Sequence, residues 1–211
     1  MSVLRFDRHE AREPLRPDAV PQRALLQRVP AAFRAVQDDL AALNTIVCFG
    51  DSNTWGFVPG SDWGRYPREV RWPARLARAL ADEVEVIAEG LNGRTATIES
   101  PVAEGRNGLP YLVPCLRSHA PVDLLVVYLG TNDAYWLEPI MVAGSIGRLV
   151  KVARAAEAGP NRGAPDVLVV CPPPFGGHVL APAFRDVCDL LGCELLAVAA
   201  AVEERVRRML A

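Results

Sequence analysis

The sequence predicts a three-layer α/β/α sandwich built on a mostly parallel sheet of about five strands. Short apolar segments rich in Val, Ile and Leu recur along the chain without polar alternation, as in strands that are buried on both faces of a sheet. Segments with helical periodicity lie between most of them. Strands that alternate with helices are typical of parallel sheets covered by helices on both sides.

These patterns assign each element in order. Strands are expected at Thr45–Phe49, Val84–Ala88, Asp123–Leu129, Asp166–Cys171 and Cys193–Leu196. Helices are expected near Trp72–Ala81, Ile140–Ala158, Leu180–Leu191 and Ala197–Leu210. The run Pro172–Pro174 ends the fourth strand, because proline has no N–H to donate to a strand ladder.

Residues 1–44 precede this pattern and are expected to form an extension to the domain at 45–211. Residues 1–20 are polar and rich in Arg and Pro, which indicates irregular structure. Between Leu25 and Leu43 apolar residues recur at steps of three and four, but Pro30 interrupts the stripe. The stripe predicts two short helices or one kinked helix. It could fold back as a hairpin or form a contact in a homo-oligomer.

Composition and charge exclude several classes of protein. The net charge of −2 gives no electrostatic case for binding nucleic acid or an anionic membrane surface. No apolar run approaches the ~20 residues that a membrane helix needs, and Met1–Asp18 lacks the apolar segment of a secretory signal. We therefore expect a cytoplasmic protein with no nucleic-acid or membrane partner.

Cysteine usage and motif searches argue against metals and cofactors. The five cysteines are odd in number and contain no CxxC pair, which argues against a disulfide framework or a zinc site. Buried thiols are the simpler expectation. The chain has no Walker loop, no HExxH and no GxGxxG after the first strand, so neither a metal nor an organic cofactor is expected.

Glycines and small polar residues collect after the predicted strands, at the edge where open parallel sheets bind ligands. Ser52 follows the first strand and should begin a helix or turn, with its hydroxyl in the cleft. Asp51–Thr54 would also serve as an ordinary N-cap sequence. Gly93 could present an unobstructed backbone N–H, and Asn132 a side-chain N–H. With the Ser52 N–H, these donors could stabilise the oxyanion of an acyl-transfer intermediate.

These segments carry a resemblance to a known family. Gly50-Asp51-Ser52-x-Thr54-x-Gly56 resembles the first block of the SGNH/GDSL serine hydrolases. Gly90-x-Asn92-Gly93-Arg94-Thr95 resembles the second block, and Gly130-Thr131-Asn132-Asp133 matches the third. Trp55, Gly64–Arg71 and the run Val86 to Thr97 are most similar to the arylesterase/acyltransferase branch.

The resemblance implies a flavodoxin-like sandwich that hydrolyses small acyl esters, with acyl transfer as a related activity. It implies Ser52 as the nucleophile, and the Ser52 N–H, the Gly93 N–H and the Asn132 side chain as the oxyanion hole. Asp51, Trp55, Arg94 and Asp133 are further candidates near the substrate. Asp133 could instead hold the loop geometry, and Arg94 could form a surface salt bridge. Trp55, Phe57 and Trp136 could line a pocket or belong to the core.

The family's last block, an Asp-x-x-His pair after the fifth strand, has no counterpart here. No histidine follows His178 and no aspartate follows Asp189. Compared with the family's pattern, the domain is therefore expected to be shortened in its C-terminal third. The chain could be a degenerate form, the sequence could be incomplete, or another histidine could substitute. His178, which follows the fourth strand, is the surrogate base that we consider, with Asp186 or Asp189 to orient it. His119 is expected near the opposite edge.

Three functions follow from these observations. The first is a serine esterase, which would be feeble if no histidine replaces the missing base. The second is a non-catalytic binding or scaffold protein that keeps the fold. The third is a flavodoxin-like regulatory or nucleotide-binding domain with phosphate at Gly50–Gly56, although Asp51 in that loop would repel a phosphate.

Overall fold

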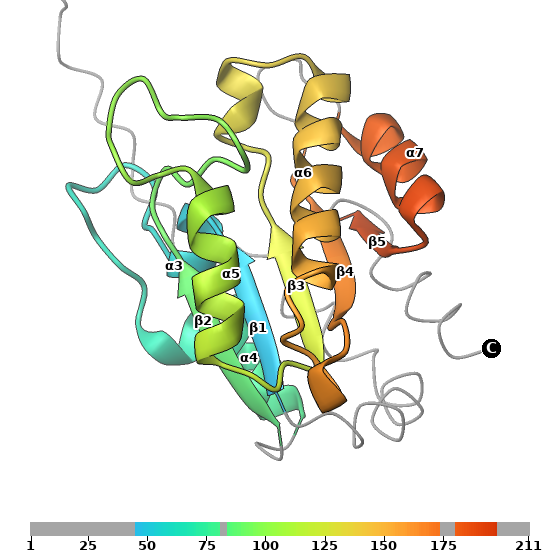
Figure 1. Ribbon diagram of the computed structural model, residues 1–211. Helices are drawn as coiled ribbons and strands as arrows, with labels where there is room; N and C mark the ends of the chain where they lie inside the picture. The colour runs from blue at the N-terminus through green and yellow to red at the C-terminus, as the bar shows by residue number, and fades with distance from the viewer. Residues whose placement is uncertain (1–44, 81–83, 174–179, 198–211) are drawn as a thin grey trace, which may run out of the picture.

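The computed structural model describes residues 45–80, 84–173 and 180–197. Helices flank a parallel sheet on both faces (Figure 1), which confirms the predicted α/β sandwich. The N-terminal extension of residues 1–44 and its expected helices lie outside the described residues, as does His178.

Five strands form the sheet in the order β2-β1-β3-β4-β5, and all neighbouring strands are parallel. They are β1 Thr45–Gly50, β2 Glu85–Gly90, β3 Leu124–Tyr128, β4 Asp166–Cys171 and β5 Glu194–Ala197. Every expected strand is therefore present, with small shifts at its ends. Ala197 does not begin a helix as expected, because it pairs with Cys171 and is the last residue of β5.

Helices cover the two faces of the sheet unequally in the described part of the chain. On one face lie α5 Gly108–Ser118, α6 Pro139–Arg154 and α7 Ala181–Leu191; on the other lies α4 Trp72–Ala79. A single-turn helix, α3 Ser52–Trp55, follows β1 directly. Short 3₁₀ turns complete the connections: η1 Arg68–Val70, η2 Asp133–Tyr135 and η3 Pro160–Arg162.

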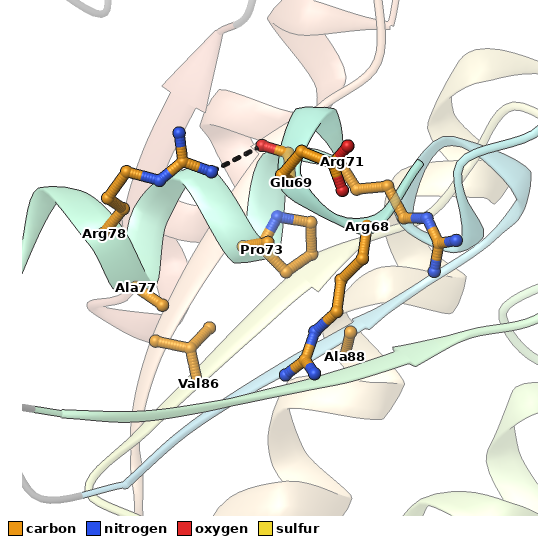
Figure 2. Close-up of a pocket in the computed structure, with 9 residues that line it drawn as sticks. Arg68, Glu69, Arg71, Pro73, Ala77, Arg78, Val86 and Ala88 are labelled. Carbon is orange, nitrogen blue, oxygen red and sulfur yellow. Dashed lines mark hydrogen bonds between the residues drawn. The ribbon is translucent and has the colours of Figure 1, made fainter. Parts of the chain in front are cut away.

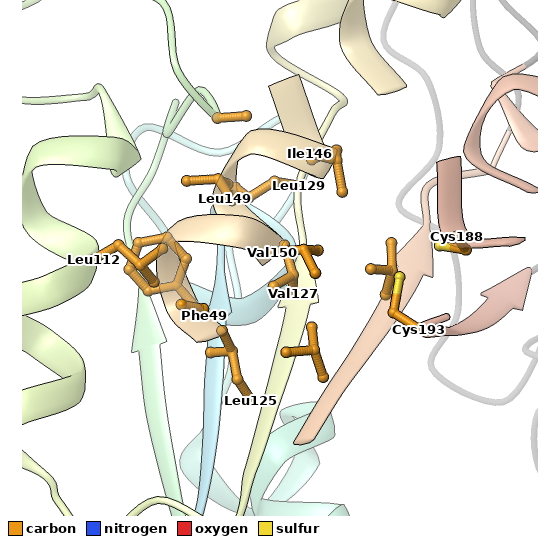
Figure 3. Close-up of a cluster of buried hydrophobic side chains, with 14 of the residues drawn as sticks. Phe49, Leu112, Leu125, Val127, Leu129, Ile146, Leu149, Val150, Cys188 and Cys193 are labelled. Carbon is orange, nitrogen blue, oxygen red and sulfur yellow. The ribbon is translucent and has the colours of Figure 1, made fainter. Parts of the chain in front are cut away.

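Alternation along the strands divides the hydrophobic core between the two faces. Val47 and Phe49 of β1 belong to the larger cluster beneath α5 and α6, whereas Ile46 and Cys48 pack on the α4 side. Figure 3 shows the larger cluster, in which Phe49 lies beside Leu112 of α5. Full burial of such side chains contributes about 1.5–3 kcal/mol each. Since Phe49 directly precedes Gly50, this packing fixes the strand end from which the candidate site begins.

Helix α5 is not among the helices expected from the sequence, and it contains two prolines, Pro110 and Pro114. Pro110 lies in the first turn, where backbone N–H groups have no acceptor within the helix. Pro114 lies inside the helix and removes one hydrogen bond. Burial of Leu112 and Leu116, both inaccessible to solvent, offsets that loss. Tertiary packing has overridden local propensity here.

The five cysteines are all buried and free of disulfides, as expected from the sequence. Within the described residues, none of the helices combines the length and apolar composition that crossing a membrane requires.

Candidate active site

The sheet register brings the three glycine-containing segments together at the carboxyl edge. Gly50, the last residue of β1, lies opposite Gly90 of β2 and Tyr128 of β3. The loops that follow these three strands therefore start side by side. They carry Ser52, Gly93 and Asn132 respectively.

Ser52 is the first residue of α3, and its position is fixed by the cap before it. The Asp51 side chain accepts hydrogen bonds from the Asn53 backbone N–H at 2.8 Å and from Asn53 Nδ2 at 2.9 Å. The Thr54 and Trp55 N–H groups bond to the Asp51 carbonyl. Among the described residues no hydrogen bond engages the Ser52 N–H. It is thus free to donate to a bound oxyanion.

Glycine is required at two positions of the second segment, at Gly90 because the backbone of α3 lies against it and at Gly93 because its φ is positive. A Cβ at Gly90 would lie 2.2 Å from the Trp55 backbone nitrogen, so glycine lets β2 end directly against α3. Gly93 has a φ of +73°, and a Cβ there would meet the Arg106 guanidinium at 2.3 Å. The second segment therefore packs against the Ser52 loop on one side and beneath Arg106 on the other.

A cavity of about 380 Å³ opens between these loops. Ser52, Asn92 and Gly93 line it together with residues of the 57–63 loop and one arginine: Phe57, Ser61, Asp62, Trp63 and Arg106. The nucleophile and the oxyanion donor expected from the sequence thus face the same space. Its size suits a small ligand.

A second cavity, of about 360 Å³, lies between α4 and β2 (Figure 2). Its lining includes Arg68, Arg71 and Arg78, and Arg78 donates to the Glu69 carbonyl. None of the residues expected to act on an ester lines this cavity. We therefore place the candidate active site at the carboxyl edge of the sheet.

Asn132 lies beside the second segment. Its Nδ2 donates to the Arg94 carbonyl at 2.9 Å, one residue beyond Gly93. An amide NH₂ has two N–H bonds, so the second remains available for an oxyanion. The hydrogen bond to Arg94 orients the amide and links the loop after β3 to the loop after β2.

Arg94 is only 4% exposed, and its guanidinium lies under the site. It donates to the carbonyls of Gly50 and Glu89, at the ends of β1 and β2. Its Cζ lies 4.2 Å from the Phe49 ring centroid and 5.4 Å from that of Tyr111. Burial lowers the pKa of Arg94, and the charge of Glu89 opposes this shift.

Two fully buried carboxylates support the same loops. Asp133 accepts from the Ala96 N–H with both oxygens, at 2.9 and 3.0 Å, and so holds the chain that follows Arg94. Burial raises the pKa of Asp133 to about 6; the bond from Ala96 opposes this, and the charge of Asp51 adds to it. Burial likewise raises the pKa of Asp51 to about 6, and the two hydrogen bonds from Asn53 oppose this shift.

Three residues that the sequence places near the substrate are buried in the structure. Asp51, Arg94 and Asp133 are at most 4% exposed, and each bonds to the protein's own backbone. These bonds support the loops, as in the loop-holding alternative for Asp133, and contact of the three side chains with substrate stays a prediction. Trp55 is half-buried beneath the Arg65 guanidinium, whose Cζ lies 4.5 Å from the ring centroid. Its contact with substrate stays a prediction.

Sequence reasoning did not identify Arg106 or Trp63, both of which line the cavity. Arg106 reaches Gly93 because Thr95 bonds to the Arg106 carbonyl and closes the intervening loop. Among the described residues its guanidinium has no hydrogen-bond or ion-pair partner. Trp63 is 70% exposed and has a φ of +66°. No local motif marks either residue, because a long loop closure and an unusual backbone conformation place them.

Of the two histidines that follow the first strand in the sequence, only His119 lies in the described part of the chain. His178, the expected surrogate base, lies outside the described residues. His119 follows α5, and its Nε2 lies 3.0 Å from Oε1 of Glu89 on β2. His119 therefore has a hydrogen-bonding partner on β2, and it does not line the Ser52 cavity.

Comparison with known proteins agrees with this geometry. Residues 48–208 match the model of the GDSL-like Lipase/Acylhydrolase family. The chain belongs to the GDSL-like lipase/acylhydrolase family. A comparison with curated protein sequences found no match.

Solved structures extend the likeness to particular GDSL-like esterases. A carbohydrate acetylesterase from Sinorhizobium meliloti is 35% identical over 73% of this chain and 83% of its own, with a TM-score of 0.68. The aryl esterase of M. smegmatis gives the same identity, coverage and TM-score. A second structure of a carbohydrate acetylesterase family member from Sinorhizobium meliloti is 37% identical, covers 74% and 83% of the two chains, and has a TM-score of 0.66. Family membership and these neighbours support ester hydrolysis as the general activity.

The buried Asp133 carboxyl should make stability depend on pH. Its folded-state pKa lies above the unfolded value, so the folded chain binds the proton more tightly, and stability falls as pH rises through about 6. Between pH 7 and pH 5 this group should add about 1 kcal/mol to the free energy of unfolding. Asp133→Asn keeps an acceptor for Ala96 but cannot ionise, so its increase should be smaller by that amount. Urea unfolding at both pH values measures the difference.

The control for this experiment is Asp166→Asn, at an exposed position where β4 begins. This variant should keep the pH dependence of the parent chain. Equal increases in the parent and in Asp133→Asn would show that the buried carboxyl does not have the raised pKa.

Proposed function

We propose that the chain hydrolyses small carboxylic esters with Ser52 as the nucleophile. The observation that carries this proposal is the shared cavity of about 380 Å³, which Ser52 and Gly93 both line. Asn132 supports it from the neighbouring loop, since its amide is held on the Arg94 carbonyl. These are the groups that acyl transfer requires at one place: a hydroxyl nucleophile and converging N–H donors.

In the proposed reaction, Ser52 Oγ attacks the ester carbonyl carbon and its proton passes to a base. The carbonyl oxygen becomes negative and accepts hydrogen bonds from the Ser52 N–H, the Gly93 N–H and the Asn132 amide. Collapse of the intermediate expels the alcohol, which takes the proton, and leaves an acyl group on Ser52. Water then attacks this acyl-serine in the same way and releases the acid. An alcohol in place of water would give acyl transfer.

Removal of the Ser52 proton requires a base. The sequence has no histidine after His178, so the family's Asp-x-x-His pair is absent from it. His178 follows β4 by seven residues and is the histidine that we propose for proton transfer. Loss of the base in a triad enzyme costs on the order of 10⁶ in turnover, whereas an oxyanion hole and binding alone retain roughly 10³–10⁴ over water. The account thus predicts slower hydrolysis than a complete triad would give.

The cavity indicates the kind of ester. Two of the similar structures are named a carbohydrate acetylesterase and an aryl esterase. We propose an acetyl-sized acyl group beside Ser52, with the alcohol part against Phe57 and Trp63. An exposed indole can stack on an aryl ring or on the apolar face of a sugar. The cytoplasmic location, the homo-oligomer and the lack of nucleic-acid and membrane partners stay predictions from the sequence.

The alternative function is a non-catalytic binding protein that keeps the GDSL-like fold. The absence of the Asp-x-x-His pair from the sequence favours it. Such a protein would still present N–H donors and Arg106 to an acyl or anionic ligand, but Ser52 would not turn over. Kinetics separate the two functions directly.

Initial rates of p-nitrophenyl acetate hydrolysis should place the parent chain well above Ser52→Ala. His178→Ala should fall towards the Ser52→Ala rate, because removing either the nucleophile or its base removes the same step. His9→Ala, in the polar N-terminal segment, is the matched histidine control and should equal the parent. A parent rate no higher than that of Ser52→Ala would exclude the esterase proposal. An unchanged rate in His178→Ala would exclude this histidine as the base.

Arg106 should favour substrates that carry a negative charge. Its guanidinium packs on Gly93 at the cavity wall without a partner among the described residues. In Arg106→Gln, kcat/KM for 4-acetoxybenzoate should fall roughly two- to fivefold, as expected for a partly exposed ion pair. The value for the uncharged methyl ester should change less. Arg148→Gln, at an exposed position on α6, is the control. Equal losses for both esters would contradict an electrostatic role.

A further inference from the structure

A second set of polar side chains, separate from the Ser52 cavity, lies between β2 and the C-terminal end of α5. Glu89, Cys115 and His119 each direct one potential ligand atom into the same space, and these atoms all lie within 4.8 Å of one another. The carboxylate and imidazole are in direct contact, with Glu89 Oε1 3.0 Å from His119 Nε2. The esterase mechanism uses none of these side chains.

The local structure explains how the three residues meet. Cys115 and His119 are four residues apart, one on the last turns of α5 and the other at its C-cap, so they share a face of the helix. Glu89 is the penultimate residue of β2, the edge strand beneath α5. Its second oxygen, Oε2, accepts from the Tyr111 hydroxyl at 3.1 Å. Tyr111 thereby turns Oε1 towards the other two residues.

We propose that Glu89, Cys115 and His119 form a binding site for a divalent transition metal of the zinc class. Thiolate, imidazole and carboxylate are the ligands that zinc takes from proteins. Bond lengths of about 2.0–2.3 Å hold the ligands of a tetrahedral ion roughly 3.3–3.8 Å apart. The widest separation therefore needs to close by about an ångström, which the rotatable Glu89 and His119 side chains allow.

Burial and charge fit such a site. Cys115 is 2% exposed, whereas the His119 and Glu89 side chains are 29% and 20% exposed, so an ion can enter from their side. Binding exchanges the thiol proton of Cys115 for the metal and forms an S–metal bond, while Glu89 supplies a second negative charge. These two negative charges balance the charge of a divalent ion. Tyr111 provides the outer hydrogen bond that ligating carboxylates usually have.

Three protein ligands leave a fourth position for water. The ion would join β2 to α5 close to the segment that carries Gly93, and its role there would be structural.

The absence of a CxxC pair led us to expect no zinc site from the sequence. That expectation does not cover Glu89, Cys115 and His119, because here a cysteine and a histidine one helical turn apart meet a carboxylate from another element. The proposal does not depend on ester hydrolysis by Ser52.

Cobalt(II) is the probe that tests the proposal, since it replaces zinc and reports thiolate ligation by absorption. The full chain in a chelator-free buffer should bind one Co²⁺ with a thiolate-to-cobalt charge-transfer band, and Zn²⁺ should abolish the band by displacement. Cys115→Ser and His119→Gln should lose the band. Tyr111→Phe should bind about 10- to 100-fold more weakly, because it removes only the outer hydrogen bond.

Cys48→Ala and His9→Ala are the matched controls and should retain the band, since each removes the same residue type elsewhere in the chain. Ser52→Ala should also retain it, which separates this site from the esterase proposal. Circular dichroism confirms that each variant is folded. Absence of the band in the folded parent, or its persistence in Cys115→Ser, would reduce the cluster to an ordinary His–Glu ion pair beside a buried thiol.

Discussion

The candidate site depends on the hydrogen bonds that the buried Arg94 guanidinium donates to the ends of two strands. Arg94 bonds to the carbonyls of Gly50 and Glu89 and so ties the ends of β1 and β2 together. Its own carbonyl accepts from Asn132, which adds the loop after β3. One residue therefore joins the three segments that carry the proposed nucleophile and oxyanion donors. A lysine would not be equivalent, because an ammonium lacks the flat guanidinium face that packs against the Phe49 ring.

The same arrangement explains how the three segments are held together although the given sequence has no Asp-x-x-His pair. The first three segments are held by hydrogen bonds among themselves and by the core beneath Phe49, with Asp133 fixing Ala96. None of these contacts involves the C-terminal segment where the Asp-x-x-His pair would lie. Preorganised donors and proton transfer are thus separate properties of this fold. A chain can keep the first while the second weakens, which is the situation we propose here.

The sequence predicted the sheet well because buried parallel strands have a simple apolar pattern. It missed α5, whose two prolines are tolerated only because one lies in the first turn and the other is compensated by burial of Leu112 and Leu116. Ser52, Gly93 and Asn132 were identifiable because they lie in short motifs that directly follow strands.

Residues that depend on tertiary contacts could not be assigned in the same way. The sequence suggests a surface or substrate-binding role for Arg94, whereas in the structure its guanidinium packs against the rings of Phe49 and Tyr111. Arg106 enters the cavity through a loop closed at Thr95, and His119 meets Glu89 across 30 residues of chain. Sequence motifs report local chemistry, whereas these roles arise from which distant segments the fold brings together.

The most direct test of the central claim is covalent labelling with a fluorophosphonate, followed by mass spectrometry of the digested chain. Attack by a serine on phosphorus expels fluoride and leaves a stable adduct, so even a slow nucleophile accumulates label with time. The account predicts one adduct per chain, on the peptide that contains Ser52, and none in Ser52→Ala. A folded parent chain that stays unlabelled after long incubation, or that carries its label on another residue, would contradict the assignment of Ser52 as the nucleophile.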